Sequence, residues 1–186
     1  MLQNGLFFLI IWYCLNTTET AANWNFILSF PQLICKPIIP QVIKRLECSY
    51  SQLGPNQFSG SGLVMLNQQL GTEFDVHVKV TIRTHGKYLK FLDLKLNVCD
   101  TLKASMSVPL IRKLYNNVLQ SSNFPRKCPV KANVLYNISN LIVDRSYFPK
   151  YTPSPMDFNF SIDYFVNEKK FAMLLLEGTT VPVRMK

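Results

Sequence analysis

The sequence predicts an all-β fold, an antiparallel β-sandwich with one amphipathic helix. About eight segments alternate apolar and polar residues, as half-buried strands do, and a single segment has the periodicity of a helix. The 186 residues show no break in composition, which suits one domain. Because so many one-sided apolar strands need a second sheet or a helix to cover them, a sandwich is the favoured arrangement.

The clearest strands are neighbours in the middle of the chain. Residues 72–83 alternate strictly, and residues 84–87 predict a hairpin turn into a second strand, which ends at Cys99. We expect the two strands to pair, with one face buried and the other basic and hydrated. Their inward positions are Phe74, Val76, Val78, Val80 and Ile82 on the first strand and Leu92, Leu94, Leu96 and Val98 on the second.

The one strong helical pattern covers residues 108–122. Ser107 suits the N-cap and Pro109 the first turn. The apolar positions of this segment recur at three- and four-residue intervals: Ile111, Leu114, Tyr115 and Val118. Residues 123–129 then bring the chain to Cys128, so a Cys99–Cys128 disulfide would close a unit of strand, helix and return loop.

Three earlier segments are less regular strands. Residues 23–35 alternate but are interrupted at Pro31, and residues 41–50 can return beside them as the second strand. A turn at residues 54–56 leads into the extended residues 57–70, whose two glycines indicate a bulge or a close backbone approach.

The chain after Cys128 also consists of strands. Residues 130–143 form one, and the proline-rich residues 144–155 form a stiff extended connection with little scope for a helix. A last hairpin joins a strand starting at Phe158 to residues 171–177. The inward positions on its first arm are Phe158, Phe160, Ile162 and Tyr164.

The N-terminus resembles a secretory signal peptide, residues 1–22. Its apolar run, residues 6–15, is too short to span a bilayer, which needs about 20 residues, but suits the hydrophobic part of a signal. We expect cleavage near Ala22, secretion to the extracellular space, and a single mature domain over residues 23–186. An uncleaved anchor and a buried first strand are the alternatives.

Loss of the signal would remove Cys14 and leave four cysteines. An even number suits a disulfide framework in an oxidising compartment, and three pairings are possible. We favour Cys35 with Cys48, facing each other across paired strands, and Cys99 with Cys128. No cysteine pair has the short spacing of a metal site, so no metal is expected.

The chain is strongly basic, with a net charge of +9 that rises by one if Glu19 leaves with the signal. A basic secreted protein can bind anionic glycans, membranes or acidic ligands, although a merely solvated surface is the simpler interpretation. Nucleic acid fits poorly, because the basic residues are scattered along the strands. Sequons at Asn137 and Asn159 are glycosylation candidates.

Nothing in the sequence indicates an enzyme or a cofactor. No nucleophile elbow or phosphate-binding glycine loop is present. His77 and His85 share one hairpin with no nucleophile near them in sequence, and His77 is expected to face solvent. Asp93 and Asp100 lie seven residues apart, which would place them on opposite faces of a regular strand.

The abundant apolar strand surface has two interpretations, because facing sheets either interlock as a dry core or stay apart around an apolar ligand. The order of motifs resembles a large insect family of small secreted proteins that is distantly related to the ML lipid-recognition domains of the ganglioside-activator type. Some members of that family are linked to chemosensory bristles and pheromone perception. The resemblance covers residues 32–177. It rests on Cys35 and Cys48 thirteen residues apart and on residues 86–94, 98–100, 122–125, 127–129, 136–138 and 148–153.

This resemblance implies an immunoglobulin-like, ML-like sandwich that opens around a lipid or another hydrophobic ligand such as a pheromone-like hydrocarbon. We therefore expect a monomeric, non-enzymatic carrier or presenter. The alternative is an extracellular interaction protein with a filled core, acting as a receptor accessory or a binder of anionic surfaces. The expected cavity lining is Val76, Val78, Val80, Leu92, Leu94, Leu96, Phe158, Phe160 and Ile162, with Leu114 and Val118 covering one mouth.

Overall fold

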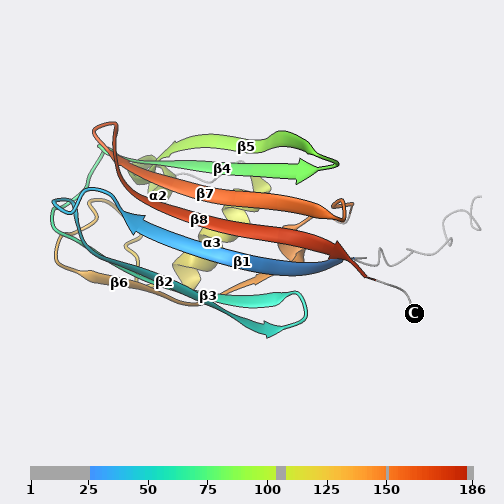
Figure 1. The fold of residues 1–186 in the computed structure, drawn as a ribbon. Coiled ribbons are helices and arrows are strands. Elements are labelled where there is room, and N and C mark those ends of the chain that lie inside the picture. The colour runs from blue at the N-terminus through green and yellow to red at the C-terminus, as the bar shows by residue number, and fades with distance from the viewer. Residues whose placement is uncertain (1–25, 104–107, 150, 184–186) are drawn as a thin grey trace, which may run out of the picture.

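The computed structural model describes residues 26–103, 108–149 and 151–183, which fold into two antiparallel sheets (Figure 1). The expected signal peptide, residues 1–22, lies outside the described residues, as do Cys14 and Ser107. The larger sheet has the strand order β1 (Phe26–Pro37), β8 (Lys169–Pro182), β7 (Met156–Val166), β4 (Phe74–Thr84) and β5 (Lys87–Asn97). The smaller has the order β2 (Ile43–Gly54), β3 (Gln57–Leu66) and β6 (Leu135–Asp144). The predicted all-β sandwich is therefore confirmed.

Local turn chemistry fixes the hairpins. β4 and β5 meet in a two-residue turn in which His85 and Gly86 have φ values of 49° and 75°, as a tight hairpin requires. Asn56 has a φ of 60° in the turn from β2 to β3, and Asn167 and Glu168 take positive values between β7 and β8. The predicted bulge near Gly60 and Gly62 is present, as a register shift in the pairing of β3 with β6.

The first two strands differ from the prediction, because β1 and β2 lie in different sheets. β1 pairs with β8, and β2 pairs with β3. The register of β1 shifts between Ser29 and Gln32, around Pro31, which cannot donate to a ladder hydrogen bond. The Cys35–Cys48 disulfide, with a Cα–Cα distance of 6.0 Å, consequently joins the two sheets rather than two paired strands.

A short helix, α2 (Val98–Lys103), replaces the predicted end of the strand at Cys99. The Asn97 side chain accepts a hydrogen bond from the Asp100 amide at 3.2 Å, and the Thr101 hydroxyl donates to the Asn97 carbonyl at 2.7 Å. Asn97 therefore acts as a cap and turns the chain out of the sheet. The second predicted disulfide, Cys99–Cys128, is present with Cys99 buried.

The predicted amphipathic helix is α3 (Pro109–Gln120), with Pro109 in its first turn as expected. Its N-cap residue is Val108, which provides no side-chain cap. The connection at residues 144–155, expected to lack helix, contains the short 3₁₀ helix η1 (Arg145–Tyr147). The Asp144 carboxylate accepts from the Ser146 amide at 2.8 Å and caps this turn.

Two buried clusters lie between the layers. The first gathers around Leu70 and Val130, whose amides and carbonyls are hydrogen-bonded to each other, and it includes Phe74, Val166 and Phe171. The second consists of Phe26, Leu28, Phe30, Phe58, Met156 and Phe158. Aromatic rings pack edge to face in the second cluster, where the Phe30 and Phe58 centroids lie 4.4 Å apart.

Candidate functional site

The inner face of the larger sheet carries apolar side chains in continuous rows across its strands. Strand register places Leu94, Val78, Ile162 and Leu174 side by side, on β5, β4, β7 and β8. The next row consists of Leu92, Val80, Phe160 and Leu176, and the row on the other side consists of Leu96, Val76, Tyr164 and Ala172. We call these the three central rows.

All nine strand residues predicted to line a cavity face inward. Eight belong to the central rows, while Phe158 lies in the second buried cluster. The central rows also contain Tyr164, Ala172, Leu174 and Leu176, which were absent from the predicted lining. Alternation along β7 did place Tyr164 on the inward face with Phe160 and Ile162, although the predicted lining left it out. The three consecutive leucines of β8 hid its parity, because alternation cannot show which of them faces inward.

The two rows nearest the middle of the sheet are incompletely covered. Val78 and Val80 are 5% and 9% exposed, but Leu92, Leu94, Phe160 and Ile162 each keep more accessible surface. Among the described residues, only Leu176 of these two rows packs against either buried cluster. Ile162 lies on β7, which has a paired strand on each side, so strand edges do not account for its exposure. An inward side chain in this position keeps accessible surface only where the opposite layer leaves it uncovered.

The side of the sandwich at β1 is held closed. The Cys35–Cys48 disulfide crosses it, and the Tyr50 hydroxyl of β2 donates to the Phe30 carbonyl of β1. Asn56 accepts from the Leu28 amide at 2.5 Å and donates to the Phe26 carbonyl at 3.3 Å. These bonds satisfy backbone groups on the free edge of β1 and fix the smaller sheet against it.

Helix α3 lies on the side of the larger sheet that also carries the smaller sheet (Figure 1). Its C-terminal end is joined to β6 through the bridge between Ser122 and Ile138. On η1, the Ser146 hydroxyl receives a 2.6 Å hydrogen bond from Lys113, and Tyr147 receives one from Asn117. Ile111 is buried, whereas Leu114 and Val118, the residues predicted to cover a mouth, are half-buried. The second layer opposite the central rows therefore includes a helix tethered at its rim.

Tyr164 is the one hydrogen-bonding side chain in the central rows. Its ring lies near those of Phe74 and Phe171, at centroid distances of 6.5 and 6.2 Å. Burial raises the pKa of Tyr164 to about 12. Within the described part of the chain, its hydroxyl has no hydrogen-bond partner, and the only fully sealed side-chain atom without one is Ser154 Oγ. The Tyr164 hydroxyl is therefore deep in the molecule without being sealed by protein atoms.

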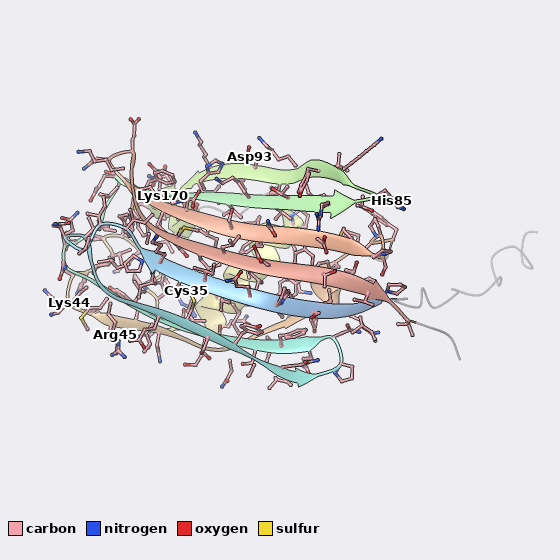
Figure 2. All side chains as sticks on the ribbon, viewed as in Figure 1. Cys35, Lys44, Arg45, His85, Asp93 and Lys170 are labelled. Atoms are coloured by element: carbon pink, nitrogen blue, oxygen red, sulfur yellow. A yellow bond between two sulfur atoms is a disulfide. The ribbon has the colours of Figure 1, made fainter. Side chains whose placement is uncertain are left out.

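The outer face of the larger sheet is ionic instead. Asp93 contacts His77 and lies 2.6 Å from Lys90, and hydrogen bonds from Lys90 and then His77 lower the pKa of Asp93 to about 2. Asp163, 6% exposed, lies 2.8 Å from Lys79 and 2.5 Å from Lys170. Figure 2 labels Asp93 and Lys170 on this sheet. Both carboxylates are paired with cations, so neither cluster presents a free carboxylate for acid–base chemistry.

The other candidate residues lie apart from the central rows. His77 belongs to the outer face of β4, His85 to the hairpin tip, and Asp100 to α2, so the two aspartates suggested by sequence do not form a pair. The sequon residues Asn137 and Asn159 are both exposed, on β6 and on the outer face of β7.

One open depression of about 460 Å³ lies elsewhere, between the turn from β2 to β3 and the start of η1. Its lining includes Asn56, Asp144 and Arg145. Asn56 and Asp144 are already engaged in structural hydrogen bonds. This depression does not coincide with the central rows.

The described residues contain no group of three or more metal-binding side chains. The same part of the chain has no helix with the length and apolar character needed to cross a membrane.

No curated protein matches the chain. A solved structure described as "Crystal structure of protein from Archaeoglobus fulgidus" is 10% identical and aligns over 77% of this chain and 99% of its own, with a TM-score of 0.27, which is too low to establish a shared fold. A family model matches residues 76–172, from β4 to the start of β8 and so including most of the central rows. The match extends over more than half of the sequence, and the chain therefore belongs to the family described as "Protein of unknown function (DUF1091)".

Proposed function

We propose that this protein is an extracellular, non-enzymatic binding protein that holds a hydrophobic ligand between its two layers. The observation that carries the proposal is the incomplete covering of the central rows. Apolar side chains such as Phe160 and Ile162 face inward and lie on a fully paired strand, yet they retain accessible surface. Binding sites for apolar small molecules are largely preformed concavities with such a lining.

The asymmetry of the sandwich supports a route for the ligand. The β1 side is fixed by a disulfide and several hydrogen bonds, whereas β5 is a free edge with Leu92, Leu94 and Leu96 half-buried. We infer that ligand enters on the β5 side, past α3. Leu114 and Val118 of the helix would cover that mouth, as the sequence pattern suggested.

Two disulfides favour an oxidising, extracellular location. Membership of the matched family agrees with the resemblance to insect relatives of the ML lipid-recognition domains. That resemblance extends the proposal to pheromone-like ligands and to a role in chemosensation.

A pair of tryptophan variants on β7 tests the proposal. Ile162→Trp places a large apolar ring among the central rows, and Ser161→Trp places the same ring on the outer face of the same strand. If the rows line an open space, Ile162→Trp folds with an unfolding midpoint close to that of the parent and no longer binds an apolar fluorescent probe. Ser161→Trp still binds the probe.

A filled core predicts a different outcome. Ile162→Trp would then overpack the interior and lower stability by about 1–3 kcal/mol. The parent protein would also fail to bind the probe, and that pair of results would refute the proposal.

The second candidate function is binding of an anionic surface through a basic end of the molecule. Figure 2 places Lys44, Arg45 and Lys170 at one end, opposite His85 at the hairpin tip. Lys44 forms no ion pair with any described residue, whereas Arg45 and Lys170 are paired with Glu47 and Asp163. The net charge of +9 favours this candidate. It predicts binding that is strongly weakened by salt, which ligand uptake between the sheets would not show.

A further inference from the structure

The central rows carry eleven apolar side chains and one hydroxyl, that of Tyr164. The row neighbours of Tyr164 are Val76 on β4 and the buried Ala172 on β8, neither of which offers it a hydrogen-bond partner. Tyr164 packs at the border of the first buried cluster, so its ring marks one end of the incompletely covered rows.

Four other tyrosine hydroxyls have partners within the protein, and one of them, the exposed Tyr88, accepts from Arg83 at 3.5 Å. The Tyr136 hydroxyl accepts from the Lys131 amide at 3.0 Å, the Tyr50 hydroxyl donates to the Phe30 carbonyl, and Tyr147 is bonded to Asn117. Leaving a buried hydroxyl without a partner is unfavourable, and native proteins therefore satisfy nearly all such groups. The Tyr164 hydroxyl has no protein partner among the described residues and is not sealed, so its partner has to come from whatever occupies the space beside it.

The charges around the rows restrict that partner further. The cations of β4 and β5 belong to the outer face or the edge, and no Lys, Arg or His occupies a central-row position. An anionic head group would thus be buried without a counter-charge, at a cost of several kcal/mol. A neutral oxygen can accept the tyrosine proton without that cost.

We propose that Tyr164 binds the single polar group of an elongated neutral ligand, a long-chain alcohol, aldehyde, ketone or ester, by donating a hydrogen bond to its oxygen. This inference rests on the proposed function, because the apolar chain of the ligand lies along the rows of Ile162 and Phe160. Tyr164 determines specificity for neutral oxygenated chains over bare hydrocarbons and fatty acids.

Displacement of a bound apolar fluorescent probe tests the inference with three compounds of equal chain length, tetradecane, tetradecan-1-ol and tetradecanoic acid. One hydrogen bond is worth about 0.5–1.5 kcal/mol, so the parent protein should bind the alcohol about twofold to tenfold more tightly than the alkane. The acid at pH 7 should bind more weakly than the alcohol. Tyr164→Phe should bind alcohol and alkane equally, with alkane affinity unchanged.

Two matched variants remove a hydroxyl elsewhere. Tyr115→Phe changes a half-buried tyrosine of α3, and Tyr88→Phe changes one that is 70% exposed on β5. Both should keep the preference for the alcohol. Loss of the preference in Tyr115→Phe but not in Tyr164→Phe would overturn the assignment.

Comparing the three compounds on the parent protein needs no variant and tests the role of Tyr164 separately from the proposed function. Binding of alkane and alcohol with equal affinity would overturn the role of Tyr164 and leave the proposed function standing. Failure of all three compounds and of the probe to bind would overturn the proposed function and the inference together.

Discussion

Gly178 lies against the ring of Phe158, where a β-carbon would come within 2.1 Å of Cζ. The ring cannot move away freely, since Phe30 and Phe148 pack against it at centroid distances of 5.9 and 5.1 Å. We expect Gly178→Ala to lower the free energy of unfolding by about 1–3 kcal/mol through overpacking. Urea denaturation measures the change. Gly54→Ala is the control, because no described atom lies within 4 Å of the position that its β-carbon would take, and stability should change by less than about 1 kcal/mol.

The outer face of the larger sheet carries the buried carboxylate of Asp163, which lies between Lys79 and Lys170. Burial alone would raise its pKa, but hydrogen bonds from Lys170 and Lys79 outweigh burial and lower it. Because the folded-state pKa lies below the unfolded value, Asp163 stabilises the fold above about pH 4, and this contribution is lost as the pH falls through the folded pKa. Asp163→Asn should therefore unfold more easily than the parent at pH 7, by about 1–3 kcal/mol, with a smaller difference near pH 2. A difference that stays constant with pH would contradict the assignment.

At the scale of elements, the two disulfides should contribute unequally to stability. Cys99–Cys128 links residues 29 apart in sequence and closes a loop with α3 and most of α2, whereas Cys35–Cys48 links residues 13 apart. The chain-entropy model gives about 3.6 kcal/mol for the longer loop and about 2.9 for the shorter. The Cys99→Ala, Cys128→Ala double variant should therefore be the less stable of the two double variants in urea. The opposite order would show that fixing the sheets together through Cys35 outweighs loop closure.

The elements also show where sequence reasoning succeeds. The β4–β5 hairpin was predicted correctly because its alternation and its turn are local. The sheet membership of β1 and β2 was predicted wrongly because it depends on the pairing of β1 with β8, more than 130 residues away in sequence. α2 was missed because six residues show too little periodicity, and its cause, the capping by Asn97, is a side-chain contact.

Part of the candidate site could likewise be predicted from the sequence, and part could not. Alternation identified the inward residues of β4, β5 and β7, and strand register places them in continuous rows. The leucine run of β8 has no alternation to interpret. The proposed ligand-binding role of Tyr164 rests on the absence of a hydrogen-bond partner among the described residues, and no sequence pattern records such an absence. Whether facing rows interlock or stay apart depends on the distance between two layers, and periodicity carries no information about that distance.

For the molecule as a whole, the distribution of charge separates the two candidate functions. The interior rows are neutral and the excess of basic residues lies on the surface. We expect the protein to bind a heparin column through this surface and to elute with moderate salt, while uptake of an apolar probe stays unchanged over the same salt range. Uptake that falls in parallel with heparin binding would place the probe on the basic surface instead of between the sheets.

The central claim is that the space between the two layers holds a hydrophobic molecule. Native mass spectrometry of the protein purified from insect-cell medium, followed by organic extraction, tests it most directly. We expect a neutral, oxygen-bearing apolar molecule to co-purify at one per chain, to be absent from Ile162→Trp and to be retained by Ser161→Trp. A ligand-free protein that also fails to bind alkanes, long-chain alcohols and esters would contradict the claim. The inward apolar faces would then belong to a closed core.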